Sequence, residues 1–246
     1  MKPLKDELQL SQTVGLKEYD RYMDPSPPEQ EYMLIYIKSR YEQNNHLSIL
    51  EIGPGTGRFT KKIAKSFPEA KITLLEPDKN CIIELNKTFM NQKNIKIIQG
   101  KAEKTEIGSR FDIICLATSF HHIHDNYKLL VLQKLASLLL EKGVIVLSDN
   151  FIADYANEKE RRKVLIDYHE KWIRDAISNK DKNSEAMARK MKELVLQENG
   201  GEYFLSPQKL EEYLEKANLS IVGKVNVTNY KANEDGNKYF YLLEKK

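Results

Sequence analysis

Five short apolar runs, each separated from the next by an amphipathic or charged stretch, dominate the chain between residues 47 and 149. Runs this short and this rich in Ile, Leu and Val are typical of strands that are buried on both faces. The stretches between them place apolar residues at helical spacing, as Phe59, Ile63 and Phe67 do. Strands and helices that alternate in this way predict a parallel sheet with helices on both sides. The predicted strands are residues 47–52, 71–76, 95–100, 111–118 and 143–149, and residues 126–140 are predicted to form the helix before the fifth strand.

The pattern changes after Asn150. Residues 154–198 are strongly charged, and their apolar stripe at helical spacing predicts helical structure outside the sheet. A further helix over 206–218, which begins with a Ser-Pro pair, precedes two final strands joined by a loop that contains Asp-Gly. We therefore expect an α/β fold. Its doubly wound sheet has seven strands, mostly parallel with an antiparallel C-terminal hairpin strand, and a helical insertion follows strand five.

The same breaks divide the chain into four parts. Residues 1–27 are a polar, tyrosine-bearing segment that ends in DPSPP, and residues 28–150 are the α/β core. Residues 151–205 form the helical insertion, which we expect to cover the substrate. Residues 206–246 complete the core sheet with the last helix and strand pair.

Composition excludes several classes of protein. With 41% hydrophobic residues the chain has material for a large core, and no apolar run is long enough to span a membrane. The N-terminus lacks the apolar region of a signal peptide. Cys81 and Cys115 both lie in apolar surroundings, which predicts buried free thiols and a cytoplasmic location. The net charge of +3 is too mild to favour a nucleic-acid partner.

Three glycines follow the first predicted strand, in the sequence LEIGPGTGRFT. A phosphate-binding P-loop would continue with Lys and Ser or Thr, whereas Gly57 is followed by Arg58 and Phe59. The dinucleotide fingerprint G-x-G-x-x-G is also not met, because the third glycine comes one residue early. Glu51, just ahead of the loop, would repel an anion and attract a cation. The pattern predicts a close-approach surface for a cationic ligand.

An acid follows the second strand as well, Glu76 in LLEPD. With that acid in place, EIGPGTG resembles the first motif of the class I S-adenosylmethionine (SAM)-dependent methyltransferases, and the rest of residues 47–150 matches that family in order. The resemblance implies a Rossmann-like fold and SAM as cofactor. It also implies that the loop passes beneath the amino acid and ribose of SAM and that Glu76 accepts hydrogen bonds from both ribose hydroxyls. Asp78 is expected to cap the next helix instead.

The resemblance assigns further residues to the cofactor. QGKAEK resembles the segment that holds adenine, through the Ala102 backbone and the Glu103 side chain, although Lys101 stands where family members often have Asp. Ile52 or Pro77 is expected to line the adenine slot. KEYDRYMD resembles the lid segment that closes over SAM. The full expected cofactor set is Tyr19, Tyr22, Glu51, Gly53, Gly55, Gly57, Glu76, Pro77, Ala102, Glu103 and Thr118.

The fourth strand is followed by ATSFHHIHD, where the family places residues between the SAM methyl group and the substrate. Three histidines here suggest a metal, but His121 and His122 are adjacent, His121 and His124 are three apart, and no carboxylate or cysteine set accompanies them. We therefore expect no metal. We expect His121 or His122 to be a general base or a substrate clamp.

Residues after strand five are the candidates for substrate contact. Asp149 and Asn150 are expected to leave the strand toward the pocket, with ordinary loop positions as the alternative. The insertion stripe residues Tyr168, His169 and Trp172 either line the pocket or dock the insertion on the core. The basic run 161–163 either binds a carboxylate or is a solvated helix face.

The main functional hypothesis is transfer of the SAM methyl group to a small molecule by direct displacement, in a monomer or homodimer. One alternative keeps SAM but changes the chemistry, to aminocarboxypropyl transfer or to cyclisation that releases methylthioadenosine. Two others are RNA methylation, which the charge disfavours, and a non-catalytic SAM-binding protein that forms a complex with another chain. Fold resemblance indicates the cofactor and leaves the acceptor open.

Overall fold

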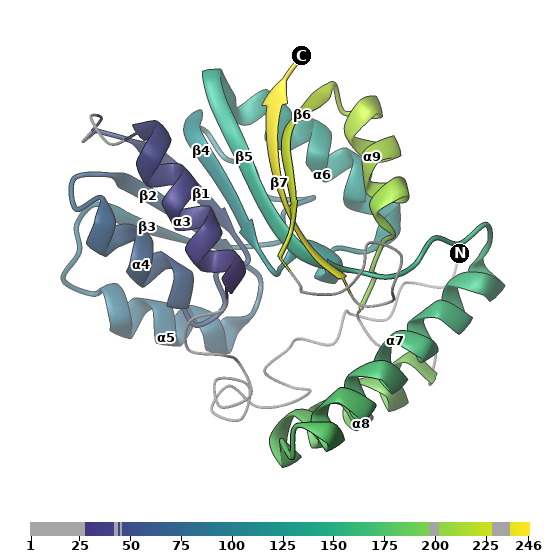
Figure 1. Ribbon diagram of the computed structural model, residues 1–246. Helices are drawn as coiled ribbons and strands as arrows, with labels where there is room; N and C mark the ends of the chain where they lie inside the picture. Colours follow the sequence, from purple (N-terminus) through teal and green to yellow (C-terminus); the bar gives the residue numbers. More distant parts are fainter. Residues whose placement is uncertain (1–27, 42–43, 45, 197–201, 228–236) are drawn as a thin grey trace.

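The centre of the molecule is one seven-stranded sheet with the strand order β3-β2-β1-β4-β5-β7-β6 (Figure 1). The computed structural model describes residues 28–41, 44, 46–196, 202–227 and 237–246. The first five strands are parallel, and β7 is antiparallel to both β5 and β6. The predicted fold class is therefore confirmed. The strands are β1 (Ser48–Ile52), β2 (Lys71–Glu76), β3 (Ile95–Gln99), β4 (Phe111–Ala117), β5 (Leu139–Phe151), β6 (Leu219–Asn226) and β7 (Asn237–Lys245).

Helices cover both faces of the sheet, because successive strand residues bury their side chains on opposite sides. In β1, the Ile49 side chain packs against the helices on one face of the sheet. The Leu50 side chain packs against the helices on the opposite face. The helices on the first face are α3 (Pro28–Tyr41), α4 (Arg58–Ser66) and α5 (Lys79–Phe89), and those on the second are α6 (Asp125–Leu138) and α9 (Pro207–Lys216). Figure 1 shows the two sets flanking the sheet. Parallel strands sandwiched in this way have no solvent-facing side.

Helix beginnings follow local sequence. Asp78 accepts hydrogen bonds from the backbone N–H groups of Asn80 (2.8 Å) and Cys81 (3.4 Å) at the start of α5, the capping role expected of it. Ser206 does the same for α9 through the Lys209 N–H (3.2 Å). Both caps satisfy N–H groups that have no partner within the helix.

The insertion is a pair of helices, α7 (Glu158–Ser178) and α8 (Lys182–Leu196), which lie beside each other and apart from the sheet (Figure 1). Two small apolar clusters hold the pair. Trp172 packs with Met187 and Met191 between the helices, and Leu165 packs with Ile152 and Phe204 toward the core. The division of the chain into four parts stays a prediction.

Strand β5 begins earlier and ends later than predicted. Its first residue, Leu139, lies opposite Phe111 of β4, so the helix expected over 126–140 ends at Leu138. At its other end β5 continues to Phe151, because antiparallel pairing with β7 extends from Val144 to that residue.

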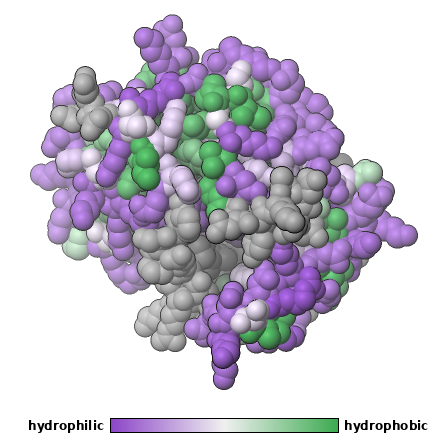
Figure 2. All heavy atoms as spheres, viewed as in Figure 1, coloured by the Kyte–Doolittle hydropathy of each residue, from purple (hydrophilic) through white to green (hydrophobic). Residues whose placement is uncertain are grey.

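Figure 2 shows a mostly hydrophilic surface on this face, with hydrophobic side chains gathered in places over the sheet. On the edge strand β6 the exposed apolar residues are Ile221, Val222 and Val225. Within the described residues, no helix is both long and apolar enough to cross a membrane. Cys81 and Cys115 are buried free thiols, as expected.

Candidate functional site

The glycine loop between β1 and α4 adopts a backbone that few other residues tolerate. Gly53, Gly55 and Gly57 have φ values of 66°, 57° and 81°, all in the left-handed region. A Cβ atom on Gly53 would lie 2.7 Å from the Cβ of Ser119, and one on Gly57 would lie 2.8 Å from side-chain carbons of Leu85 and Phe89. Among the residues that the structure describes, a Cβ on Gly55 would meet nothing within 4 Å. The loop therefore packs closely at its two ends and is open in the middle.

Glu76 ends β2 directly beside this loop. Its carboxylate accepts hydrogen bonds from the N–H of Gly55 through Oε2 and from the N–H of Asp78 through Oε1, both at 2.9 Å. The residue is buried, and burial raises the pKa of Glu76 to about 7 despite these two bonds. The acid thus joins the glycine loop to the start of α5 at the carboxyl edge of the sheet.

Glu51 lies within β1, beneath the loop. Its side chain is 1% exposed and accepts a hydrogen bond from the hydroxyl of Thr60 at 2.6 Å. Burial, with Glu76 nearby, raises the pKa of Glu51 to about 7. Two carboxyl groups that ionise near neutrality therefore flank the loop, one below it and one beside it.

The expected adenine segment follows β3. Ala102 is buried, and its carbonyl accepts a hydrogen bond from Lys134 Nζ at 2.9 Å, a contact the sequence did not suggest. Glu103 is half-buried. Of the two residues expected to line a slot here, Ile52 is buried in the core and Pro77 is exposed at the edge of the sheet.

The chain leaves β4 through a strained residue. Thr118 has a φ of 58°, which is unusual for a β-branched side chain, and its N–H donates to the Ser148 carbonyl at 2.7 Å. The next residue, Ser119, donates its hydroxyl to the Ile52 carbonyl at 2.7 Å, beside the glycine loop. Strain of this kind is common where a backbone is held for function. The β4 exit and the loop are thereby fixed against each other.

The short helix η1 (Phe120–His122) follows at once and carries both candidate catalytic histidines. Lys128 of α6 is fully buried and donates from Nζ to the carbonyls of Phe120 (2.9 Å) and Ile123 (2.5 Å). Burial lowers the pKa of Lys128 to about 7, against the opposing influence of Asp125. This lysine fixes the turn from below, and no local sequence pattern identifies it.

His121 forms a close pair with Asp149 of β5. The Nδ1 of the ring lies 2.6 Å from Asp149 Oδ1, and the His121 N–H donates to Oδ2 at 2.8 Å. Because an ionised carboxylate only accepts, Nδ1 carries the shared hydrogen and Nε2 is left on the far side of the ring. Burial alone would lower the pKa of His121, but the charge and hydrogen bond of Asp149 have the larger effect and raise it. Burial alone would raise the pKa of Asp149, but the charge and hydrogen bond of His121 lower it.

The expected exit of Asp149 and Asn150 from strand five is wrong. Both residues remain in β5, because their partners in β7, Tyr239 and Lys238, continue the ladder. Asp149 is 2% exposed and its carboxylate is bonded to His121 and to the Asn150 N–H. It lies behind His121, where it orients the ring.

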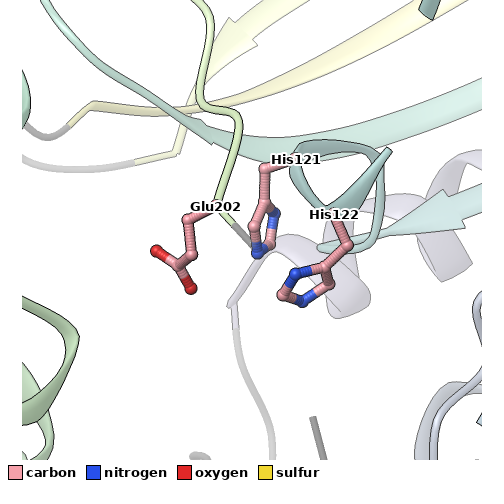
Figure 3. Close-up of side chains that lie close together, drawn as sticks. All are labelled: His121, His122 and Glu202. Atoms are coloured by element: carbon pink, nitrogen blue, oxygen red, sulfur yellow. The ribbon is translucent and has the colours of Figure 1, made fainter. Parts of the chain in front are cut away.

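The segment before α9 approaches η1 from the far end of the chain. The Tyr203 N–H donates to the His121 carbonyl at 2.7 Å, and the Phe204 ring stacks on the His121 ring at 4.7 Å with an interplanar angle of 14°. Glu202 is carried beside the two histidines, and Figure 3 shows the three side chains directed to the same side. Their potential ligand atoms all lie within 4.8 Å of one another. Burial raises the pKa of Glu202 to about 7.

The three residues of the insertion stripe make different packing contacts. Trp172 joins α7 to α8, because its Nε1 donates a hydrogen bond to Ser184 Oγ of α8 at 2.8 Å. Tyr168 lies 5.3 Å from the Phe204 ring, which links α7 to the segment beside His121. His169 is fully buried, neither ring nitrogen has a hydrogen-bond partner among the described residues, and burial lowers its pKa to about 4.

At its first residue, Arg161, the basic run at the start of α7 is not a solvated face, and the carboxylate that it binds belongs to Asp125. Arg161 is buried, where it pairs with Asp125 at 2.7 Å and donates to the Phe204 carbonyl at 3.2 Å. It thereby holds α6, α7 and the Phe204 segment together. The two lid candidates, Tyr19 and Tyr22, lie outside the described residues.

The fold and this edge define a class of protein. In doubly wound sheets, ligands bind outside the carboxyl ends of the strands where the strand order reverses. Here the reversal falls between β1 and β4, and the glycine loop, Glu76 and η1 meet beside it. A seven-stranded sheet with this order, an antiparallel β7 and a G-x-G-x-G loop is the class I methyltransferase fold.

Known proteins agree with that class. Residues 49–143 match the family model described as a methyltransferase domain. Over 144 residues the chain is 28% identical to a malonyl-[acyl-carrier protein] O-methyltransferase of Bacillus anthracis. The aligned region covers 58% of this chain and 52% of that protein. The chain thus spans little more than half the length of the curated relative it matches.

Solved structures share the fold over most of the chain. A SAM-dependent methyltransferase from Clostridium acetobutylicum superimposes with a TM-score of 0.60 at 13% identity, covering 89% of this chain and 92% of that one. A Haemonchus contortus phosphoethanolamine N-methyltransferase 2 with bound SAM gives 0.67 at 13% identity, covering 96% and 58%. The chain therefore has the class I fold of SAM-dependent methyltransferases, and residues 49–143 match their methyltransferase domain.

Proposed function

We propose that this protein transfers the methyl group of SAM to a small-molecule acceptor by direct displacement. The observation that carries the proposal is one shared edge of the sheet. The open glycine loop with Glu76 lies at the ends of β1 and β2, and the His121–Asp149 pair lies at the ends of the adjoining β4 and β5. A cofactor held by the first group would present its methyl group toward the second.

The cofactor half of the proposal rests on charge and hydrogen bonding. Glu76 is fixed at the carboxyl edge, where an ionised carboxylate accepts hydrogen bonds from two ribose hydroxyls. The gap at Gly55 lets a ligand approach the backbone, and a cationic sulfonium bound there would favour the ionised form of the buried Glu51 carboxyl. We assign to SAM the described members of the predicted set, Glu51, Gly53, Gly55, Gly57, Glu76, Pro77, Ala102, Glu103 and Thr118.

His121 and His122 form the acceptor half. Asp149 fixes the His121 ring and raises its pKa, so Nε2 is suited to take a proton from an acceptor hydroxyl or amine. Tyr168 and His169 cover this side from α7, joined to it through Phe204. The acceptor therefore lies between η1 and the insertion.

The reaction needs little covalent help from the protein, because the sulfonium already activates the methyl group. An electron pair of the acceptor forms the new bond to the methyl carbon, and the C–S bond electrons return to sulfur, which becomes neutral. The enzyme aligns the three atoms and excludes water. S-adenosylhomocysteine is the by-product.

Partners and location follow the same reasoning. We propose a monomer or homodimer that acts on a small molecule in the cytoplasm, which the two buried free thiols support. The malonyl-[acyl-carrier protein] O-methyltransferases favour an oxygen acceptor, but the chain covers only about half of such a relative.

A metabolite screen tests the proposal. The protein is incubated with SAM and fractionated cell extract, and mass spectrometry follows the methylated product and the nucleoside. We expect S-adenosylhomocysteine together with a product heavier by one methyl group in place of hydrogen. Methylthioadenosine would show the alternative SAM chemistry, and SAM binding without turnover on any fraction would contradict an enzymatic role.

A further inference from the structure

His121, His122 and Glu202 form a cluster of metal-ligand residues that the SAM reaction does not by itself require. Two nitrogens and one carboxylate oxygen lie within 4.8 Å of one another, with His121 buried and the other two half-buried. In Figure 3, His121 lies between Glu202 and His122. Two histidines and one carboxylate are a recurring ligand set for divalent transition metals.

The surroundings prepare His121 as a ligand. Metal-binding histidines commonly donate their second ring nitrogen to a carboxylate, which fixes the tautomer and the ring plane. Asp149 makes that contact with Nδ1 at 2.6 Å, and stacking on Phe204 holds the ring from one side. The lone pair of Nε2 is therefore directed away from Asp149.

Glu202 is brought to the histidines by its own segment. The Tyr203 N–H bonds to the His121 carbonyl, Arg161 binds the Phe204 carbonyl, and the Ile152 N–H donates to the Leu205 carbonyl at 3.1 Å. Three consecutive residues are thus anchored directly after Glu202. This anchoring supplies the carboxylate whose absence from the local sequence argued against a metal.

We propose that His121 Nε2, His122 and Glu202 bind one divalent transition cation of the zinc type, which holds the acceptor through an oxygen atom. Ligand atoms around such an ion are about 3.4 Å apart in tetrahedral geometry, so ligand atoms that now lie up to 4.8 Å apart must approach by up to about 1.4 Å. His122 and Glu202, which are half-buried, can make that movement by side-chain rotation. Three protein ligands leave a position open for an acceptor oxygen.

The acceptor task of the cation rests on the proposed function. In the loaded enzyme the His121 lone pair coordinates the ion and no longer takes the acceptor proton. A coordinated hydroxyl releases its proton to solvent because the ion lowers its pKa, and the remaining oxygen pair attacks the methyl carbon. The acceptor class is then a molecule with a hydroxyl or carboxylate oxygen.

Metal binding is measured on the full chain after treatment with a chelator. Titration with Co²⁺ is followed by visible absorption and titration with Zn²⁺ by calorimetry. We expect one ion per chain, and about tenfold or greater weakening in both Glu202→Gln and His122→Ala. These half-buried positions keep the fold intact, which thermal melting checks. His46→Ala, which removes an exposed histidine elsewhere, is the matched control and should bind as the wild type does.

Two results would overturn the site. One is no saturable ion binding by the wild type, and the other is equal binding by the wild type and Glu202→Gln. SAM binding by the stripped protein is measured in parallel, because its loss would contradict the proposed function separately. Intact SAM binding without ion binding would refute only the metal site and leave His121 as the base.

Discussion

At the scale of single residues, Asp149 shows how one buried carboxylate can organise a site without facing the substrate. It accepts from both the ring and the backbone of His121, so its loss would free the ring to rotate and change tautomer. Sequence reasoning identified the residue but expected it in the pocket. The correction follows from strand pairing with β7, which no local pattern reveals.

The variant Asp149→Asn tests this orienting role. We expect kcat to fall about 100-fold, because an amide cannot hold the same tautomer of His121, while SAM affinity stays within about twofold. Steady-state kinetics and SAM calorimetry measure the two quantities. Asp154→Asn, an exposed acid on the same strand exit, is the control. Unchanged kcat in Asp149→Asn would remove the pair from the mechanism.

Glu51 gives a prediction about pH and stability. Its pKa of about 7 in the folded protein exceeds its unfolded value of 4.5, so its contribution is most favourable below pH 4.5 and is lost as the pH rises toward 7. In Glu51→Gln the free energy of unfolding should therefore gain up to about 3 kcal/mol above pH 7 relative to wild type. The amide oxygen can still accept from Thr60.

Denaturant unfolding at about pH 5 and about pH 8 measures this difference. Glu69→Gln, which changes an exposed glutamate, should show none of it. An equal effect of Glu51→Gln at both pH values would mean that burial does not hold this carboxyl in its neutral form.

At the scale of elements, the glycine loop combines two different constraints. Gly57 is packed against Leu85 and Phe89 of α5, whereas no described residue would contact a Cβ placed on Gly55. Both glycines have left-handed backbones, and their spacing in the sequence does not show that their surroundings differ. Packing therefore decides which glycine serves the fold and which leaves room for a ligand.

Substitution by alanine separates the two. Gly55→Ala should cost only the backbone term, about 1–2 kcal/mol of unfolding free energy, yet weaken SAM binding because the new methyl group fills the approach. Gly57→Ala should cost more, since its Cβ would lie 2.8 Å from two side chains. Thermal melts and SAM calorimetry report both effects. Gly55→Ala with unaltered SAM affinity would contradict the close approach.

At the scale of the whole molecule, the features that could be predicted are those determined by residues close together in the sequence. Short apolar strands and the Ser206 and Asp78 caps follow from neighbouring residues, and the fold class followed from them. The meeting of Glu202 with His121, the burial of Arg161 and the support from Lys128 depend on tertiary contacts. The spacing of residues along the chain does not show which distant segments will be in contact. Glu202, the third member of the cluster with His121 and His122, could therefore not be predicted.

The central claim is that SAM binds at the carboxyl edge formed by the glycine loop and Glu76. Calorimetric titration of SAM into wild type and Glu76→Gln tests it most directly. The amide keeps the shape of the side chain but removes its charge and one acceptor, and loss of charged hydrogen bonds of about 1.5–3 kcal/mol predicts at least about tenfold weaker binding. Equal SAM affinity in the two proteins, with both folded, would contradict the account.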